Sequence, residues 1–311
     1  MFERGSSQMS SVQSKVAQTQ VQLAQGKQVI NASDAPDQAS TIQRMKSILS
    51  RQESYQSSLN TVKNRLIGEE SALQSVSDLL VRAKEVAVQG ANDTLSAGDR
   101  KALAIEMKAL RDQMLSLANT QDTNGNFMFA GSRVKQAAFA ENSSGVPIYQ
   151  GDQTRMNVRV GEQRSIPVNR TGTDAFVPVA RKDTDGTSVG VGFFKVMDDL
   201  VAGLINSKGP DIRRGVGELD NLQLGVSLAQ AQIGTNLNVV DQQTAVLDDT
   251  TLNLKTTLSS IEDLDYASAI TKMNQQMLSL EAAQSSFAKM SQLNLFNFIN
   301  WLKSHESSFS S

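Results

Sequence analysis

The chain has 311 residues, with 30 Lys and Arg against 32 Asp and Glu, a single His and no Cys. This balance of charge gives no general attraction to nucleic acid or to an anionic membrane, and the lack of Cys excludes disulfides and Cys-based metal sites. No apolar run approaches the roughly 20 residues that span a bilayer. The N-terminus lacks the apolar core of a signal peptide, so we expect no cleaved signal.

In the first helical stretch, mostly apolar residues recur at every third or fourth position, the spacing of the contact positions in a coiled coil. These residues are Phe2, Met9, Val12, Val16, Thr19, Leu23 and Ile30, with Gly5 and Gly26 at the remaining positions. The last stretch repeats the spacing with Tyr266, Ile270, Met273, Met277, Leu280, Phe287 and Met290. The pattern is that of a coiled coil, but its flanks are Ser, Gln, Asn, Thr and Ala instead of charged residues. We therefore expect that the two ends need each other, or need copies in neighbouring molecules.

The segment NASDAPDQAS, residues 31–40, interrupts this helical pattern. Asp34 is predicted to cap the next helix, with Asp37 three residues further on in a position like that of a capping box. Pro36 falls in the first turn, where its missing N–H costs little. The sequence thus predicts a joint between two helices.

Three further helical segments follow. From about Ala35 an apolar stripe keeps a near-heptad phase up to Gly90, which can serve as a C-terminal cap. Its members are Ile42, Met45, Leu49, Leu59, Val62, Leu66, Leu73, Val76 and Leu80. A helix is predicted to start at Asp99 as its N-cap, and another spans Phe194 to Ile205. A long stripe then runs from Leu219 to Ile261.

The region between Asn124 and Gly192 has a different character. It contains an Asn-Gly turn signal, alternating residues around Val158, and most of the prolines, all typical of short strands joined by turns. The predicted fold is therefore mainly α: a long antiparallel helical rod with terminal coiled-coil helices and a small β-rich domain inserted in the middle. The predicted domains are 1–33 with 264–311 (terminal coiled coil), 34–124 with 193–263 (helical rod) and 125–192 (outer β-rich insert).

The sequence offers little material for catalysis. His305 is the only histidine and lies in a polar tail, so neither a His-based triad nor an ordinary zinc site can be assembled. Carboxylate pairs such as Asp198-Asp199 point about 100° apart on a helix and are expected to be solvated. No phosphate-binding or nucleophile-elbow motif occurs. We predict no catalytic residue, no cofactor and no metal.

Several segments resemble the flagellin superfamily. LAQGKQVINASDAPDQAS (23–40) is similar to the segment that joins the terminal helix of flagellins to the next domain. IEDLDYASAITKMNQQMLSLEAAQSSFAKMSQLNLFNFI (261–299) resembles the matching C-terminal end. The middle segments GNFMFAGSRVKQAAF, YQGDQTRMNVRVGEQRSIPVNRTGTDAF and FFKVMDDLVAGL resemble the hook-associated protein 3 family more than filament flagellin.

The resemblance implies a structural protein at the junction between the hook and the filament of the bacterial flagellum, on the filament side. It implies unfolded export through the flagellar type III channel, followed by assembly of identical subunits into a ring through coiled-coil packing of the terminal helices. Its neighbours would be a hook-associated protein on the hook side and filament flagellin. Carried over by position, the subunit-interface residues are Met9, Val12, Val16, Leu23, Ile270, Met273, Met277, Leu280, Phe287, Leu293, Leu295, Phe296 and Phe298.

A cytoplasmic export chaperone is also implied, with Met273, Met277 and Phe287 as its expected contacts because they are adhesive while unpaired. Packing within one molecule is the alternative role for both apolar stripes. Two alternative functions stay open: a minor filament flagellin and, in a different class, an adhesin or receptor-binding module that acts through the β-rich insert.

Overall fold

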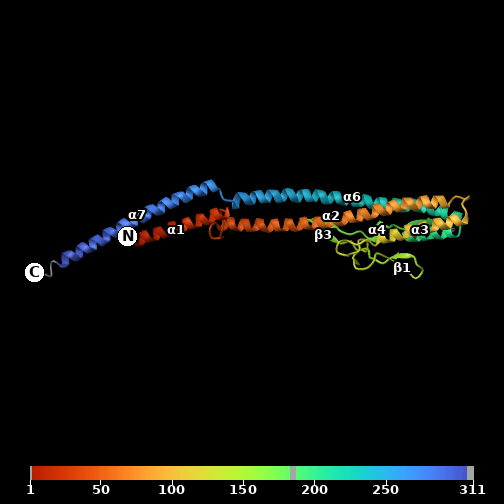
Figure 1. Cartoon of the computed structure of the whole chain (residues 1–311), viewed down its shortest axis with the longest axis horizontal. Coiled ribbons are helices and arrows are strands. Elements are labelled where there is room, and N and C mark those ends of the chain that lie inside the picture. Colours follow the sequence, from red (N-terminus) through yellow and green to blue (C-terminus); the bar gives the residue numbers. More distant parts are fainter. Residues whose placement is uncertain (1, 183–186, 307–311) are drawn as a thin grey trace. The chain divides into compact units, whose positions relative to one another are not determined.

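The computed structural model describes residues 2–182 and 187–306, and within them every side chain except those of residues 2, 4 and 290–306. Long helices dominate, and the strands of the described chain all lie between Phe139 and Val191 (Figure 1). The chain forms two compact units: a terminal unit of Met1–Ser50 with Thr250–Ser311, and a central unit of Arg51–Asp249. The predicted mainly α class with a small β-rich middle region is confirmed.

Among the described residues the strands are grouped between α3 and α5, with long helices before and after them. The helices are α1 (Phe2–Gln25), α2 (Pro36–Gly90), α3 (Ala97–Ala118), α4 (Gly172–Ala175), α5 (Phe193–Ile205), α6 (Gly209–Glu262) and α7 (Tyr266–Glu306). The strands are β1 (Phe139–Glu141), β2 (Pro147–Tyr149), β3 (Asn157–Arg159), β4 (Ser165–Pro167), β5 (Val179–Lys182) and β6 (Ser188–Val191). The predicted interruption of the helical pattern is present, because α1 ends at Gln25 and α2 begins at Pro36.

The residue that caps the N-terminus of α3 is not the predicted one. Ser96, not Asp99, is the N-cap, and its hydroxyl oxygen accepts the backbone N–H of Asp99 at 3.2 Å. The Asp99 carboxylate in turn accepts the Ser96 hydroxyl at 2.6 Å. Asp99 therefore sits in the first helical turn, where its charge is favourable.

In the central unit α2 and α6 run antiparallel. Lys63 pairs with Asp241 at 2.8 Å and Lys84 with Asp220 at 2.5 Å, so residue numbers rise along one helix as they fall along the other. The main apolar cluster of the molecule is built entirely from this unit. Its largest fully buried side chains are Phe129, Phe194, Leu59, Leu73, Leu80, Met107, Met114, Met197, Leu200, Leu204, Ile212 and Leu219.

The β-rich insert consists of three separate two-stranded antiparallel sheets, β1–β2, β3–β4 and β5–β6. β2 pairs with β1, with Phe139 opposite Tyr149, and the Gly-Asp turn after Tyr149 connects this sheet to the next. There the Asp152 carboxylate accepts the backbone N–H of Ser132 at 2.8 Å, which ties this turn to another loop.

Phenylalanine rings anchor the insert to the helices of the central unit. Phe176 lies 5.5 Å from Phe129, 5.3 Å from Phe139 and 5.1 Å from Phe193, measured between ring centroids. Phe139 also meets Phe194 of α5 edge to face at 5.1 Å. Such pairs contribute roughly 0.5–1.5 kcal/mol beyond the area that they bury.

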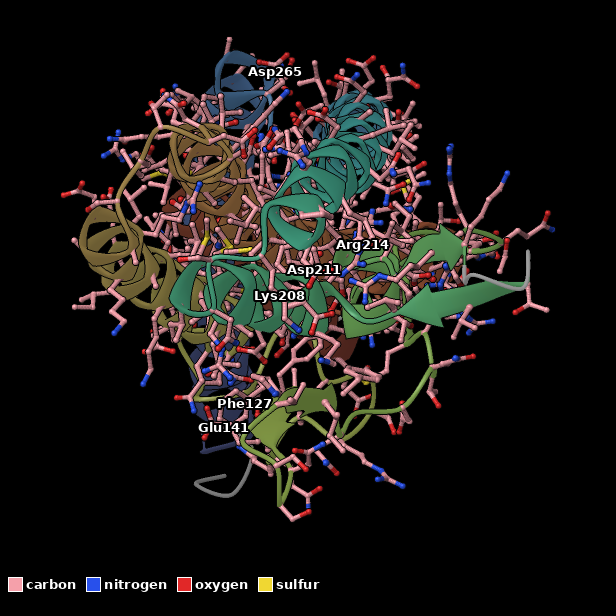
Figure 2. The ribbon with its side chains drawn as sticks, turned by 90° about the vertical axis from the view of Figure 1, so that its right-hand side faces the viewer. Phe127, Glu141, Lys208, Asp211, Arg214 and Asp265 are labelled. Atoms are coloured by element: carbon pink, nitrogen blue, oxygen red, sulfur yellow. The ribbon has the colours of Figure 1, made fainter. Side chains whose placement is uncertain are left out.

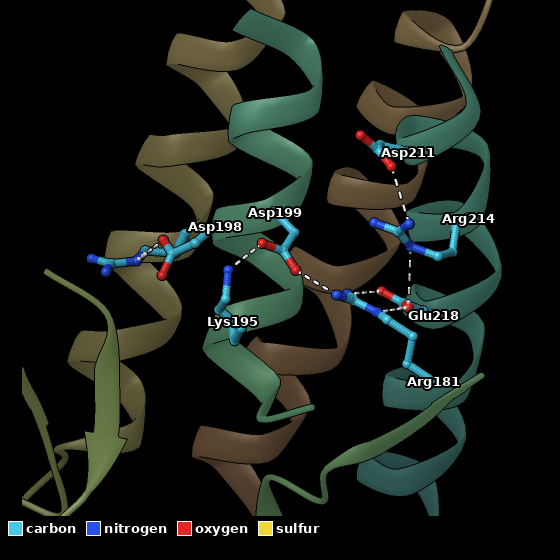
Figure 3. Close-up of polar contacts among 8 residues, drawn as sticks. Arg181, Lys195, Asp198, Asp199, Asp211, Arg214 and Glu218 are labelled. Carbon is cyan, nitrogen blue, oxygen red and sulfur yellow. Dashed lines mark hydrogen bonds and ion pairs between the residues drawn. The ribbon is translucent and has the colours of Figure 1, made fainter. Parts of the chain in front are cut away.

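Two arginines extend this anchoring with charge. Arg181 of β5 donates to both carboxylate oxygens of Glu218 on α6, at 2.6 and 2.7 Å, and to Asp199 of α5 at 2.7 Å (Figure 3). Lys195 also pairs with Asp199. The hydrogen bonds to Glu218 and Asp199 outweigh burial and raise the pKa of Arg181. Arg214 adds a contact to Glu218 and pairs with Asp211 at 3.0 Å (Figure 3). Asp211 and Arg214 both belong to the start of α6 (Figure 2).

The second arginine is Arg111, which is buried on α3. It donates to Asp198 of α5 at 3.0 Å, to Glu141 of β1 at 2.9 Å and to the carbonyl of Gly145 at 2.8 Å. Asp198 and Asp199 therefore point toward different arginines, in agreement with the expectation that they do not converge. The expectation that both are solvated is wrong, since each belongs to an ion-pair network.

Candidate assembly interface of the terminal helices

In the terminal unit α1 and α7 pack against each other in antiparallel orientation. The hydroxyl of Thr19 donates to the side-chain oxygen of Gln276 at 2.9 Å, and Gly26 lies against Tyr266. Along this seam the residues of reduced exposure are Gly5, Met9, Val12, Val16, Thr19 and Leu23 of α1, and Gly26 directly after α1. All of them belong to the predicted heptad stripe, whose first member, Phe2, has a side chain outside the described residues, and this part of the stripe faces α7 of the same chain.

The face that α7 turns toward α1 differs from the predicted one. Its residues of reduced exposure are Ala269, Met273, Gln276, Leu280, Ala283 and Phe287. Ile270 and Met277 were predicted to lie on the seam but are each 49% exposed, on the adjoining side of the helix. The register of the two helices explains this difference. Because Gln276 faces Thr19 of α1, the next residue, Met277, lies on another side of α7.

The structure thus divides the predicted interface residues into three groups. Val16 is buried, and Met9, Val12, Leu23, Met273, Leu280 and Phe287 are half-buried. Ile270 and Met277 are exposed. The side chains of Leu293, Leu295, Phe296 and Phe298 lie outside the described residues.

Tyr266, Ile270 and Met277 form an apolar strip along the outer side of α7, which we call the outer α7 stripe. Tyr266 is 53% exposed, and Leu278 beside the strip is 69% exposed. Leu278 was missed by the sequence prediction because it falls outside the heptad phase. An aligned set of large exposed side chains on one helix is typical of an interaction surface.

The α1–α7 pair is itself thinly packed. Between the helices lies a hollow of about 510 Å³ whose lining includes Val12, Lys15, Thr19, Lys272 and Gln276. Most of these side chains are polar, so the seam gains less from apolar burial than a closely packed coiled coil. This pair leaves both its seam and its outer face incompletely covered.

A short joint ties the end of α1 to the link between α6 and α7. Gly26 has a φ of +67°, a left-handed conformation that other residues rarely adopt. Its carbonyl accepts the N–H of Leu264 at 3.0 Å, and the N–H of Gln28 donates to the carbonyl of Glu262 at 2.8 Å. Lys27 and Asp263 form an isolated antiparallel bridge between these two hydrogen bonds.

Glu262 supplies the charge at this joint. Its buried side chain pairs with Lys27 at 2.7 Å and with Lys46 of α2 at 2.8 Å. Burial by itself would raise the pKa of Glu262, but the hydrogen bonds and charges of the two lysines outweigh it and hold the pKa below its usual value. Sequence reasoning missed this trio because its members are far apart along the chain.

The predicted cap residues of the joint are only partly where we expected them. Pro36 is the first residue of α2 and Asp37 lies in its first turn, as predicted. Asp34 does not cap α2, because its carboxylate accepts the backbone N–H of Asn31 at 2.9 Å and the side-chain amide of Gln18 at 3.0 Å. It stabilises the turn before the helix and connects that turn to α1.

Among the described residues, no three His, Asp or Glu side chains gather in a way that could hold a metal ion. Within those same residues, no helix combines the length and the apolar character that crossing a membrane requires. The outer α7 stripe and the joint are therefore the features with a direct bearing on function.

Comparison with known proteins gives these features a context. The model of the bacterial flagellin N-terminal helical region matches residues 4–134, and that of the C-terminal helical region matches residues 216–302. The flagellar hook-associated protein 3 of Escherichia coli is 29% identical over 288 residues, covering 88% of this chain and 90% of that protein. The protein of the same name from Salmonella typhimurium is 26% identical over 309 residues, covering 95% and 96%.

A solved structure supports the fold independently. A flagellar hook-associated protein from Vibrio parahaemolyticus superposes with a TM-score of 0.65 at 24% identity, covering 74% of this chain and all of that one. At this identity the likeness concerns the fold. The sequence matches, in contrast, include both helical ends and nearly the whole length. The chain therefore belongs to the flagellin superfamily and, within it, to the hook-associated protein 3 family.

Proposed function

We propose that this chain is a structural subunit of the bacterial flagellum that forms the junction between hook and filament, on the filament side. The likeness to two hook-associated proteins over most of the chain supports this role. The observation that carries the proposal is the outer α7 stripe, an apolar strip next to a helix pair that matches the flagellin terminal regions. Such a strip is stabilised when another subunit covers it.

The contact that covers the stripe is heterologous. Ile270 and Met277 lie on the side of α7 that adjoins the seam and are each 49% exposed, so a neighbouring subunit can reach them without opening the α1–α7 seam. A head-to-tail contact of this kind closes into a ring when its rotation allows. Complete burial of a large apolar side chain contributes roughly 1.5–3 kcal/mol, so the stripe alone can supply a substantial part of the association energy.

Before assembly no neighbouring subunit covers the outer α7 stripe, so another protein must cover it. In this proposal the chain is exported unfolded through the flagellar type III channel without a cleaved signal, and a cytoplasmic chaperone holds the C-terminal helix until then. Of the contacts expected for the chaperone, Met277 is the exposed one, whereas Met273 and Phe287 are half-buried against α1. Unchanged chaperone binding after deletion of residues 266–311 would contradict this part of the proposal.

Electron microscopy of a strain that lacks this chain tests the function directly. We expect hooks without filaments, with flagellin shed into the medium, and normal filaments would overturn the proposal. The double variant Ile270→Ser with Met277→Ser should restore few or no filaments when it is expressed in this strain. The control variant Leu252→Ser removes a Leu of α6 that is 64% exposed, and should restore filaments fully.

A minor filament flagellin is the rival role, because it would use the same helix pair. Purified protein added to filament ends separates the two. Growth of long filaments from this chain alone would favour the flagellin role. A product limited to a single layer or ring at the filament end would favour the junction role.

A further inference from the structure

The central unit contains a hollow of about 260 Å³ that the assembly role does not use. It lies between α2, α6 and the segment that leads from β4 to α4. We call it the Arg170 pocket. Its lining residues are Leu66, Glu69, Arg155, Pro167, Asn169, Arg170, Asp174, Gln232, Thr235 and Asn236.

Arg170 is the unusual member of this lining. The residue is only 8% exposed, and one guanidinium nitrogen donates to the side-chain oxygen of Gln232 at 2.8 Å. Its Nε is buried without a hydrogen-bond partner, and among the described residues no carboxylate lies within ion-pair distance of the guanidinium. Burial is also the main reason why the pKa of Arg170 is lowered. A buried cation with an unused donor is costly unless an acceptor satisfies it.

The two carboxylates beside the pocket are already engaged. Asp174 pairs with Arg155 at 2.9 Å. Glu69, which is 1% exposed, contacts Arg65 at 3.4 Å. Neither carboxylate forms an ion pair with the Arg170 guanidinium, and Arg170 lines the hollow without a charged partner at ion-pair distance.

We infer that the Arg170 pocket is a binding site for a small oxyanion, either a carboxylate or a phosphate group. The planar guanidinium presents N–H donors that match the oxygens of such a group, and Arg170 lines the hollow. The volume admits an anion of a few heavy atoms together with water. The inference does not depend on flagellar assembly, since the pocket lies wholly within the central unit.

Glu69 gives this binding a pH dependence. Burial raises its pKa to about 7, against the charges of Arg65 and Arg170. Asp122 lies beyond Arg65, and Arg155 and Asp174 stand at the rim, whereas the lining of α6 is uncharged. As the pH falls through about 7, Glu69 gains a proton and loses its negative charge. An anion in the pocket is then repelled less, so binding should be tighter at lower pH.

Calorimetric titration of the full chain with inorganic phosphate and, separately, with acetate tests the site at about pH 6 and constant ionic strength. Saturable binding of one anion per chain is expected, and the anion that binds identifies the class as phosphate, carboxylate or both. Arg170→Gln should weaken binding by at least about tenfold. The matched control is Arg213→Gln, because Arg213 is an exposed arginine of the central unit outside the pocket. It should bind like the parent chain.

Two further variants keep the test decisive if Arg170→Gln does not fold. Thr235→Asp adds a negative charge to the exposed wall of the pocket and should abolish binding with the helix content retained. Glu69→Gln should bind acetate, which is ionised at both values, equally at about pH 6 and about pH 8, whereas the parent chain loses several-fold in affinity for acetate between them. Failure of both anions to saturate the parent chain, or equal binding by Arg170→Gln or Thr235→Asp, would overturn the inference.

Discussion

The central and terminal units follow different packing rules although both are built mainly from long helices. The central unit buries a continuous apolar cluster that runs through α2, α3, α5, α6 and the insert. The buried apolar residues of the terminal unit, among its described side chains, are Val16, Val29, Ile42, Leu49 and Ala269. Apolar burial is the main source of stability, so the central unit should hold its structure alone. The terminal unit leaves surface that another subunit can cover.

Charge is also used differently in the two units. In the central unit buried Arg111 and the half-buried Arg181 each hold a β-hairpin against helices. In the terminal unit Glu262 joins one turn to a helix through two lysines that remain half in water. Removing one partner of a buried pair usually costs more than removing one partner of an exposed pair. The difference between the units therefore leads to four predictions, in order of decreasing effect.

The largest expected difference is that between two leucine truncations. Leu73→Ala creates a cavity in the centre of the central unit and should lower its free energy of unfolding by about 2–5 kcal/mol. Leu280→Ala removes a half-buried side chain of α7 and should cost the terminal unit only about 1 kcal/mol. Hydrogen exchange measured by mass spectrometry reports the two units separately. Equal losses would contradict the difference in packing.

The second prediction concerns the pH dependence of the central unit. The pKa of Glu69 is raised from 4.5 to about 7 in the folded protein, because burial disfavours its charged form. This contribution to stability is complete below about pH 4.5 and is lost as the pH rises through about 7, by up to about 3 kcal/mol.

Glu69→Gln should remove this loss, so the variant should be more stable than the parent chain at about pH 8. Urea unfolding at a series of pH values measures the effect. Glu53→Gln, an exposed position on the same helix, serves as the control and should follow the parent profile. A Glu69→Gln profile parallel to that of the parent chain would contradict the prediction.

The third prediction separates backbone strain from contact at the joint. Ala at Gly26 would take a left-handed φ and place its Cβ 2.7 Å from the Tyr266 hydroxyl. Ala at Gly125, whose φ is +72°, meets nothing within 4 Å. Both variants should lose about 1 kcal/mol from the backbone, and Gly26→Ala should lose about 1 kcal/mol more. Tyr266→Phe in the Gly26→Ala background should recover part of that extra loss, measured as hydrogen exchange around residues 26–35.

The smallest effect is expected at Glu262. Glu262→Gln weakens its pairs with Lys27 and Lys46, whose side chains are 44% and 43% exposed, and should cost about 1 kcal/mol or less. The pKa of Glu262 is lowered in the folded protein, so its contribution is present above about pH 4.5 and lost as the pH falls through the folded pKa. Acid should therefore loosen the joint in the parent chain but not in the variant. The check is to measure hydrogen exchange of residues 26–30 at decreasing pH and to compare the parent chain with the variant.

Much of the helical architecture could be predicted because helices carry a local periodic signal. The α1 stripe from Met9 to Leu23 lies on the seam where its spacing placed it, and the break before Pro36 follows from local turn chemistry. The register of α7 could not be found in this way. Ile270 and Met277 are more apolar than Ala269 and Gln276, yet the smaller and polar residues face α1.

The insert and the charged sites were harder to predict. Its strands are only three or four residues long, too short for a reliable alternation of apolar and polar residues. Apart from Asp112 next to Arg111, the charged partners of Arg111, Arg181 and Glu262 lie far away in the sequence. Nothing in a single sequence relates such pairs, although a buried arginine signals that a partner must exist.

The sequence by itself determined the mainly helical class, the presence of a joint, predicted at residues 31–40 and found at 26–35, and the resemblance to the hook-associated protein 3 family. It also predicted the absence of catalytic groups, which rests on composition. Only the tertiary structure decided that the α1 stripe faces α7 of the same chain, that Ile270 and Met277 are exposed, and that the Nε of Arg170 is buried without an acceptor. The reason is physical: helix periodicity and turn preference act over a few residues. The choice of partner, register and burial depends on contacts between segments far apart in the chain.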